Sequence, residues 1–251
     1  MKDNANLERE NAGAQSTGET APTARRYIID AVELDAASLS RAVGESRVSA
    51  KVAKRSFDVA GTLVLLIVFA PLLILIATVL KLRYGGPVLY GHRRVGRDNR
   101  EFLCLKFRTM QPDADRLLAE CLRDDPGMMA EWAATQKLRN DPRVHPIGRL
   151  LRHSSMDELP QFFNVLSGSM SLVGPRPITR DEMRYYGPDL RAYASVRPGI
   201  TGLWQVSGRN DTSYDERVAL DVRYAAKWSF AGDLRILMRT VKVVLTGRGA
   251  Y

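Results

Sequence analysis

One segment limits what this chain can fold into more than any other feature. Residues 59–80, VAGTLVLLIVFAPLLILIATVL, run for 22 residues without a charged side chain. A straight α-helix of that length measures about 33 Å, and the hydrocarbon core of a bilayer is about 30 Å thick. A small soluble domain cannot cover a helix that is apolar on every face, so the segment predicts insertion into a membrane.

A proline near the middle of this segment affects how it enters the membrane. Pro71 removes the hydrogen bond to the carbonyl of Ile67, so it kinks or breaks the helix into two arms of about half a bilayer each. Basic residues flank both ends, and such residues mark the cytoplasmic side. They are Lys51, Lys54, Arg55, Lys81, Arg83, Arg93 and Arg94. A re-entrant helical hairpin over residues 49–82 is therefore favoured over the alternative, a kinked spanning helix.

The rest of the chain divides into a polar arm and a basic domain. Residues 1–48 contain six Lys and Arg against eight Asp and Glu, which gives a net charge of −2 and predicts a largely disordered arm. The remaining residues carry +11 and need an anionic partner, which could be nucleic acid, lipid headgroups or a phosphate-bearing substrate. Two cysteines without CxxC spacing indicate a reducing compartment.

Residues 83–251 are predicted to form an α+β domain that is mostly helical. GPVLYGHRRVG and EFLCLKFRTM, separated by the polar turn RDNR, predict a β-hairpin. Residues 114–138 have a helical pattern with a break at Asp125-Pro126-Gly127. The capping box Ser213-x-x-Glu216 predicts the start of another helix, over residues 213–229.

A basic amphipathic helix is predicted in DLRILMRTVKVVL, close to the C-terminus. Arg235, Arg239 and Lys242 share one stripe, and the opposite side holds Ile236, Leu237, Val241, Val244 and Leu245. Such a helix can lie in the interface of an anionic leaflet. A core-packing helix with a solvated basic face is an alternative that the pattern supports equally.

The strongest chemical signal lies in residues 152–177, RHSSMDELPQFFNVLSGSMSLVGPRP. Ser155-x-x-Glu158 alone matches a capping box at the start of an amphipathic helix. Two adjacent carboxylates, Asp157 and Glu158, however, stand between two arginines, Arg152 and Arg176. Carboxylates inside a basic pocket predict a phosphate substrate and a divalent cation, and a hard cation with few protein ligands is typical of Mg²⁺.

Several motifs carry a family resemblance. KRSFD, YGHRRVG, KFRTM, LRHSSMDELPQFFNVLSGSMSLVGPRP and RPGITGLWQVSGRN follow one another over roughly four-fifths of the chain. Together they resemble the bacterial sugar transferases, the monotopic polyprenyl-phosphate phosphoglycosyl transferases that begin exopolysaccharide synthesis. Among the members of this family, the motifs are most similar to those of the undecaprenyl-phosphate galactosephosphotransferases.

The resemblance implies a reaction, its partners and its location. A UDP-hexose, UDP-galactose or UDP-glucose, gives its hexose-1-phosphate to undecaprenyl phosphate and releases UMP. The implied site is at the cytoplasmic face of the bacterial inner membrane, in contact with its lipid.

The resemblance also implies roles for individual residues. Asp157 attacks the β-phosphorus to form a covalent aspartyl intermediate, and Glu158, with Asp157, holds Mg²⁺. Arg152, Arg176 and Arg209 resemble phosphate-binding arginines. Lys106 and Arg108 of KFRTM are predicted to line the same pocket, and a solvated strand face is the alternative for these two residues.

A non-catalytic function is the second hypothesis. A basic membrane-anchored adaptor that binds nucleic acid or anionic lipid would explain the charge and the apolar segment. It gives no reason for the pair Asp157 and Glu158, because carboxylates oppose anion binding. An enzyme that does not act on nucleic acid is therefore favoured, while the identity of the hexose and the oligomeric state stay open.

Overall fold

A long helix, two small sheets and a series of short helices make up the described part of the chain. The computed structural model describes residues 48–135, 138–208 and 212–246, and all of them belong to one compact unit. The mostly helical α+β composition agrees with the sequence prediction. The predicted polar arm, residues 1–48, lies outside the described residues except for Val48.

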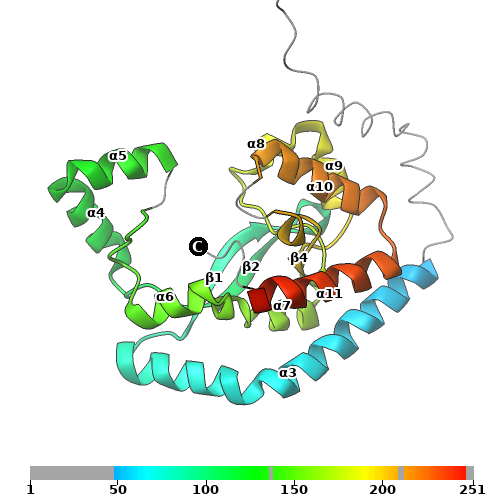
Figure 1. Cartoon of the computed structure of the whole chain (residues 1–251), viewed down its shortest axis with the longest axis horizontal. Helices are drawn as coiled ribbons and strands as arrows, with labels where there is room; N and C mark the ends of the chain where they lie inside the picture. Colours follow the sequence, from blue (N-terminus) through cyan, green and yellow to red (C-terminus); the bar gives the residue numbers. More distant parts are fainter. Residues whose placement is uncertain (1–47, 136–137, 209–211, 247–251) are drawn as a thin grey trace, which may run out of the picture. The chain divides into compact units, whose positions relative to one another are not determined.

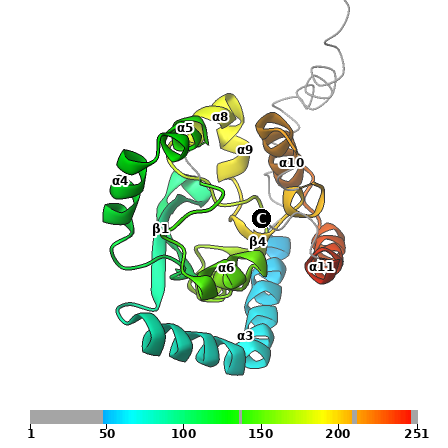
Figure 2. The same cartoon turned by 60° about the vertical axis from the view of Figure 1, so that its left-hand side comes forward.

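The apolar segment forms the long helix α3 (Val48–Tyr84), which has 37 residues and contains Pro71. The helix bends without breaking: Figure 2 shows its ribbon changing direction along its length, as expected where a proline removes a backbone hydrogen bond. Within the described residues this one helix is long and apolar enough to cross a membrane, and 11% of its most apolar window is buried.

One side of α3 packs on the rest of the domain and the other side is exposed. Phe57, Leu65, Leu66 and Phe69 contact one hydrophobic cluster, and Leu72, Leu73, Ile76 and Leu80 belong to another. The exposed side is also apolar and consists of Leu63, Val64, Ile67, Val68, Ile74 and Leu75. The helix therefore lies along the domain with an apolar surface directed outwards.

The predicted β-hairpin is confirmed. β1 (Leu89–Val95) pairs antiparallel with β2 (Glu101–Phe107), and η1 (Arg97–Asn99) connects them. Asp98 and Asn99 have φ values of 59° and 58°, a conformation that these two residue types tolerate better than most. Because opposite residues share a face of the sheet, this register puts Tyr90, His92 and Arg94 on the same face as Cys104 and Lys106.

The following helices include the predicted break. α4 (Ala114–Asp124) and α5 (Pro126–Thr135) are separated at Asp125, whose side chain accepts hydrogen bonds from the backbone amides of Gly127 and Met128. The later elements are α6 (Pro146–His153), η2 (Met156–Glu158), α7 (Gln161–Ser167), β3 (Ser171–Val173), α8 (Met183–Tyr186), η3 (Gly187–Asp189), α9 (Leu190–Ala194), β4 (Gly199–Thr201) and η4 (Trp204–Val206). β3 and β4 form a two-stranded parallel sheet.

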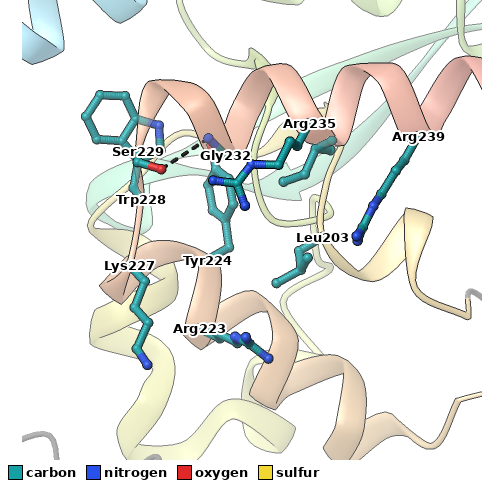
Figure 3. A pocket seen from close by; sticks show the side chains of 10 residues that line it. Leu203, Arg223, Tyr224, Lys227, Trp228, Ser229, Gly232, Arg235 and Arg239 are labelled. Carbon is teal, nitrogen blue, oxygen red and sulfur yellow. Dashed lines mark hydrogen bonds between the residues drawn. The ribbon is translucent and has the colours of Figure 1, made fainter.

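The last two helices are α10 (Tyr214–Ala226) and α11 (Phe230–Thr246), shown in Figure 1. The predicted capping box of Ser213 and Glu216 is confirmed at the start of α10. A cavity lies between α10 and α11 (Figure 3).

The amphipathic pattern predicted for α11 is only partly right. Ile236 is 6% exposed and Val241 is 60% exposed, so the prediction that both lie on one side of the helix was wrong. One side of α11 packs on the core, and another side exposes Phe230, Leu234, Met238 and Val241. The side chains of Val244 and Leu245 are not among those that the structure describes.

Candidate active site

Asp157 and Glu158 lie on η2, a short 3₁₀ turn between α6 and α7. Ser155 precedes it in the left-handed region, with φ at 56°, and its side chain makes no capping hydrogen bond. The capping box that the sequence allowed at Ser155 and Glu158 is therefore not formed. Instead, Ser155 interrupts the helical path, and the carboxylates of η2 face β2, where Lys106 lies.

Helix α6 is held tightly against the chain that follows β2. The His145 ring stacks on Tyr84 at 3.8 Å, and its Nδ1 accepts a hydrogen bond from the Gly148 amide at 2.8 Å. A Cβ added at Gly148 would collide with the carbonyl oxygen of Thr109, so only glycine allows this approach. At the other end of α6, Arg152 Nε donates to Thr109 Oγ1 at 2.8 Å, which fixes this predicted site arginine.

The two carboxylates share one lysine. Lys106 Nζ lies 2.7 Å from Glu158 Oε1 and 3.7 Å from Asp157 Oδ2. Asp157 is 7% exposed, and this burial raises the pKa of its carboxyl group above the usual value. Lys106 and Arg152 lower that pKa and Glu158 raises it further. The ionised form of Asp157 thus depends on the two cations beside it.

Asn164 aligns α7 with β2. Its Oδ1 accepts from the Leu105 amide and its Nδ2 donates to the Leu103 carbonyl, both at 2.8 Å. The side chain therefore pairs with the edge of β2 as a neighbouring strand would. Because Lys106 lies on β2 and Glu158 shortly before α7, this contact helps to set the distance between the two charged groups.

Arg176 lies between two prolines, on a segment that pairs with the chain around β4. The Gly174 amide donates to the Thr201 carbonyl at 2.9 Å, and the Gly199 amide donates to the Pro175 carbonyl at 2.8 Å. The Arg176 guanidinium stands over the Trp204 ring at 5.6 Å. A second guanidinium, from Arg217 of α10, lies 4.9 Å from the same ring.

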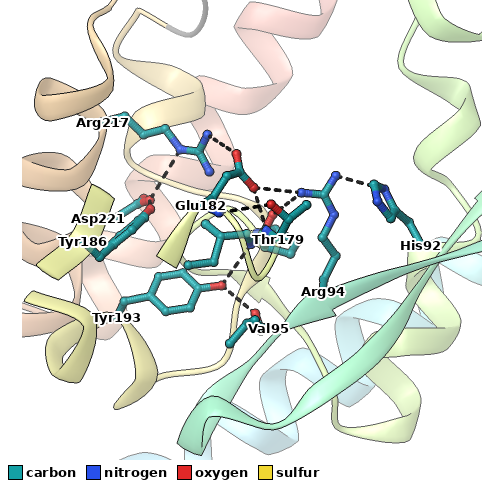
Figure 4. A network of polar contacts seen from close by, with 11 residues as sticks. His92, Arg94, Val95, Thr179, Glu182, Tyr186, Tyr193, Arg217 and Asp221 are labelled. Carbon is teal, nitrogen blue, oxygen red and sulfur yellow. Dashed lines mark hydrogen bonds and ion pairs between the residues drawn. The ribbon is translucent and has the colours of Figure 1, made fainter. Parts of the chain in front are cut away.

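A buried polar network joins α10 to β1 (Figure 4). Glu182 connects two arginines, because its Oε1 lies 3.4 Å from Arg217 Nη1 and its Oε2 lies 3.1 Å from Arg94 Nη1. Arg94 Nη2 in turn donates to His92 Nδ1 at 3.1 Å. At the other end, Asp221 Oδ2 accepts from the Tyr186 hydroxyl at 2.7 Å, and burial raises the pKa of Asp221 to about 6.

The Cys104 thiol feels charges from both the carboxylate turn and the arginine network. Burial raises its pKa to about 11; Lys106, Arg94 and Arg176 lower it, and Glu158 raises it. Cys104 is therefore within electrostatic range of the carboxylate turn and of the arginine network. His92 lies on the same face of the hairpin as Cys104, and burial together with Arg94 and Lys106 lowers the pKa of its imidazole, which favours the neutral form.

The structure brings most of the predicted site residues together. Lys106, Arg152, Asp157 and Glu158 form one group, and the charge of Arg176 acts on the Cys104 thiol together with those of Lys106 and Glu158. The Arg108 guanidinium, in contrast, donates to the carbonyls of Tyr84 and Gly85 at the end of α3. Arg209 lies outside the described residues.

The sequence interpretation missed His92, Arg94 and Arg217 as site residues. The first two had a usable signal, because the predicted hairpin alternates its faces and so places them on the same face as Lys106. Arg217 had none, since it reaches the site from a helix far along the chain.

The carboxylates of Asp157 and Glu158 are suited to a magnesium ion that is bound by both the protein and the substrate. Among the residues described, no group of three or more His, Cys, Asp and Glu side chains could hold a metal by itself. Mg²⁺ usually takes one or two carboxylates and fills its shell with water and phosphate oxygens, and Asp157 with Glu158 supplies that many.

Comparison with known proteins gives consistent matches. The family model described as bacterial sugar transferase matches residues 49–247. The exopolysaccharide production protein ExoY of Rhizobium meliloti (strain 1021) is 50% identical over 199 residues, which cover 79% of this chain and 88% of that protein. The undecaprenyl-phosphate galactose phosphotransferase of Salmonella typhimurium (strain LT2) is 49% identical over 203 residues, which cover 81% of this chain and 42% of that protein. The UDP-glucose:undecaprenyl-phosphate glucose-1-phosphate transferase of Caulobacter vibrioides is 42% identical over 213 residues, which cover 82% of this chain and 74% of that protein.

Proposed function

Because the chain belongs to the bacterial sugar transferase family, we propose that it transfers a hexose-1-phosphate from a UDP-hexose to undecaprenyl phosphate in exopolysaccharide synthesis. Relatives named for galactose and for glucose transfer are similar to it, so galactose and glucose are the two candidate hexoses. One observation carries the proposal: a buried carboxylate, Asp157, stands beside Glu158 and Lys106 in a cationic site.

In the proposed first step, an ionised oxygen of Asp157 attacks the β-phosphorus of the UDP-hexose. The bond from this phosphorus to the bridging oxygen breaks, and UMP leaves with the electron pair. An oxygen of undecaprenyl phosphate then attacks the same phosphorus and releases the Asp157 carboxylate. A phosphate monoester has a second pKa near 6 and is largely ionised at pH 7, so the acceptor needs little help from a base.

The surrounding charges support an attack by one anion on another. Lys106 and Arg152 stabilise the Asp157 carboxylate, as the causes of its pKa shift indicate. Arg94 shares a face of the hairpin with Cys104, and the positive charges of Arg94 and Arg176 both lower the pKa of the Cys104 thiol. Preorganised cations of this kind stabilise negative charge on a transferring phosphoryl group. Mg²⁺, held by Glu158 and Asp157, would neutralise charge on the diphosphate.

We propose that α3 enters one leaflet and returns to the same side. A straight helix of its 37 residues would be about 55 Å long and would carry one end away from the domain. Both ends instead contact the domain. Arg55 donates to the carbonyls of Val165 and Leu166 at 2.6 and 2.9 Å, and Tyr84 stacks on His145 at 3.8 Å. The apolar row on the outer side would then face lipid.

The proposed chemistry is tested by trapping the intermediate. Purified full-length protein is incubated with UDP-hexoses labelled in the sugar, without the lipid acceptor, and label on the protein and released UMP are measured. Asp157→Asn is expected to abolish both signals, while Asp124→Asn, an exposed carboxylate paired with Arg123, should keep them. Substantial turnover by Asp157→Asn would refute the nucleophile, and a wild type that releases no UMP with any UDP-hexose would favour the adaptor.

The role of the metal is tested separately. Glu158→Gln should lower the rate and raise the Mg²⁺ concentration needed for half-maximal activity, since it removes one anionic ligand. An unchanged response to Mg²⁺ in this variant would remove Glu158 from the metal site.

A further inference from the structure

The cavity between α10 and α11 is lined by four positively charged side chains. Its volume is about 250 Å³, below the size typical of sites for drug-sized ligands. The cavity is lined by Arg223 of α10, Lys227 directly after α10, and Arg235 and Arg239 of α11, with Tyr224, Trp228 and Ser229 between them and no acidic residue. Figure 3 shows the side chains of Arg235 and Arg239 extending from α11 on the side where Leu203 lies.

The four cations have no acidic partner within the part of the chain that the structure describes. Some cations elsewhere in the domain do pair, such as Arg116 with Asp113 at 2.6 Å and Arg143 with Asp141 at 2.7 Å, whereas this cavity gathers four that do not pair within the described residues. Like charges on neighbouring turns of a helix repel each other, so the arrangement costs free energy unless an anion enters. The cavity is therefore suited to a phosphate-bearing ligand.

The position of the cavity on α11 indicates where that phosphate comes from. Phe230, Leu234, Met238 and Val241 form an exposed apolar row on this helix. Arg235 and Arg239 each follow a member of the row directly, so the basic stripe runs beside it, about 100° further round the helix. When the apolar row is buried among acyl chains, the basic stripe reaches the level of the lipid phosphates.

Contacts between α11 and α3 tie the cavity to the membrane-facing helix. The rings of Phe57 and Phe230 meet edge to face at 5.0 Å, and Lys54 Nζ lies 2.7 Å from Asp233 Oδ2. Asp233 also accepts from Tyr224 and Trp228, two residues that line the cavity. The cavity is thus built into the side of the domain that carries the apolar helix.

We propose that this cavity binds the phosphate headgroup of an anionic phospholipid, at a site separate from the one around Asp157. It depends on membrane association but not on the transfer reaction. Each basic residue contributes about fivefold to the preference for an anionic over a zwitterionic lipid, which corresponds to about 1 kcal/mol per cation at a membrane surface.

The test counts lipids bound to full-length protein that has been stripped of lipid in an uncharged detergent. Native mass spectrometry follows the addition of phosphatidylglycerol or phosphatidylcholine. Wild-type protein should retain phosphatidylglycerol preferentially, and Arg235→Gln with Arg239→Gln should reduce the preference by about fivefold for each cation removed. Arg235→Lys with Arg239→Lys should keep it. The control, Arg180→Gln with Arg191→Gln, removes the same charge from exposed positions outside the cavity and should also keep it.

Three results would overturn the proposal: an unchanged preference in the double Gln variant, displacement of phosphatidylglycerol by millimolar inorganic phosphate, or stronger retention of undecaprenyl phosphate at the same arginines. Asp157→Asn should bind phosphatidylglycerol like the wild type. Failure of this lipid site and failure of the proposed reaction are therefore observed separately.

Discussion

At the scale of single residues, the site is governed by how Asp157 is kept ionised. Burial works against its charge, and Glu158 works in the same direction, whereas Lys106 and Arg152 oppose both. Lys106 is the shared partner, with Nζ at 2.7 Å from Glu158 and 3.7 Å from Asp157. A buried carboxylate with few water molecules around it is a stronger nucleophile than a hydrated one, provided that a cation keeps it charged.

Lys106→Gln is expected to shift the acid limb of the rate–pH profile to higher pH. The pKa of Asp157 is already raised, and loss of the cation raises it further, so activity falls at a higher pH when the solution is acidified. The rate at the optimum should also fall, by roughly 10²-fold, because a charge that stabilises the transition state is lost. Lys106→Arg should leave the acid limb in place. The measurement is kcat/KM from pH 4.5 to 8.5, a range set by the usual carboxyl pKa of about 4.

Arg108→Gln is the matched variant from the same motif. The Arg108 guanidinium caps the carbonyls of Tyr84 and Gly85, so its loss should destabilise the end of α3 and leave the acid limb unchanged. If Arg108 contacts a substrate phosphate, as the family resemblance implies, KM for the UDP-hexose rises as well. Thermal unfolding and KM, measured on one preparation, distinguish these two roles.

At the scale of secondary-structure elements, local signals predicted local structure. The hairpin, the break at Asp125 and the capping box at Ser213 depend on residues close together in sequence, and all three are present. The turn at Ser155 was missed because its left-handed conformation serves contacts between η2 and β2. The pairing of Asn164 with β2 joins residues about 60 apart in sequence, which no pattern of periodicity can indicate.

Asn164→Ala is expected to destabilise the domain by about 1–3 kcal/mol. The change removes the partner of the Leu105 amide and of the Leu103 carbonyl, and both of these hydrogen bonds are partly shielded from water. Ser167→Ala is the control on the same helix, because its exposed hydroxyl bonds only to helix α7 and the following turn, and it should cost less than about 0.5 kcal/mol. Thermal unfolding in detergent, followed by tryptophan fluorescence, measures both. Equal midpoints for the two variants would show that Asn164 does not hold α7 to β2.

At the scale of the whole molecule, two helices have exposed apolar surfaces. Phe57 of α3 contacts Phe230 of α11, so the two helices meet, and each of them exposes an apolar row. Large exposed apolar surfaces are rare on soluble proteins. The sequence indicated the α3 surface through its length and lack of charge. It left the orientation of α11 open, because that helix both packs on the core and exposes apolar residues.

The last prediction concerns topology and uses cysteine labelling in intact cells. Cysteines are placed one at a time at Asn4, before α3, and at Arg100, which is exposed after η1 and has an ordinary φ of −78°. Cys121 is replaced by serine. Cys104 stays, because it is buried and its pKa is raised to about 11, so its thiol should not react. A re-entrant α3 keeps both sites on the cytoplasmic side, so an impermeant thiol reagent should label neither in intact cells and both after lysis.

Pro71→Ala lets the same experiment distinguish a re-entrant α3 from a spanning one. Restoring the hydrogen bond to Ile67 favours a straight helix, and the 22 uncharged residues are long enough to span about 30 Å of hydrocarbon. Some molecules should then expose the Asn4 site to the reagent from outside, and transfer activity should fall in proportion, because a spanning α3 cannot keep both ends on the domain that holds Asp157. Labelling of the Asn4 site from outside in the protein with Pro71 intact and fully active would overturn the re-entrant arrangement.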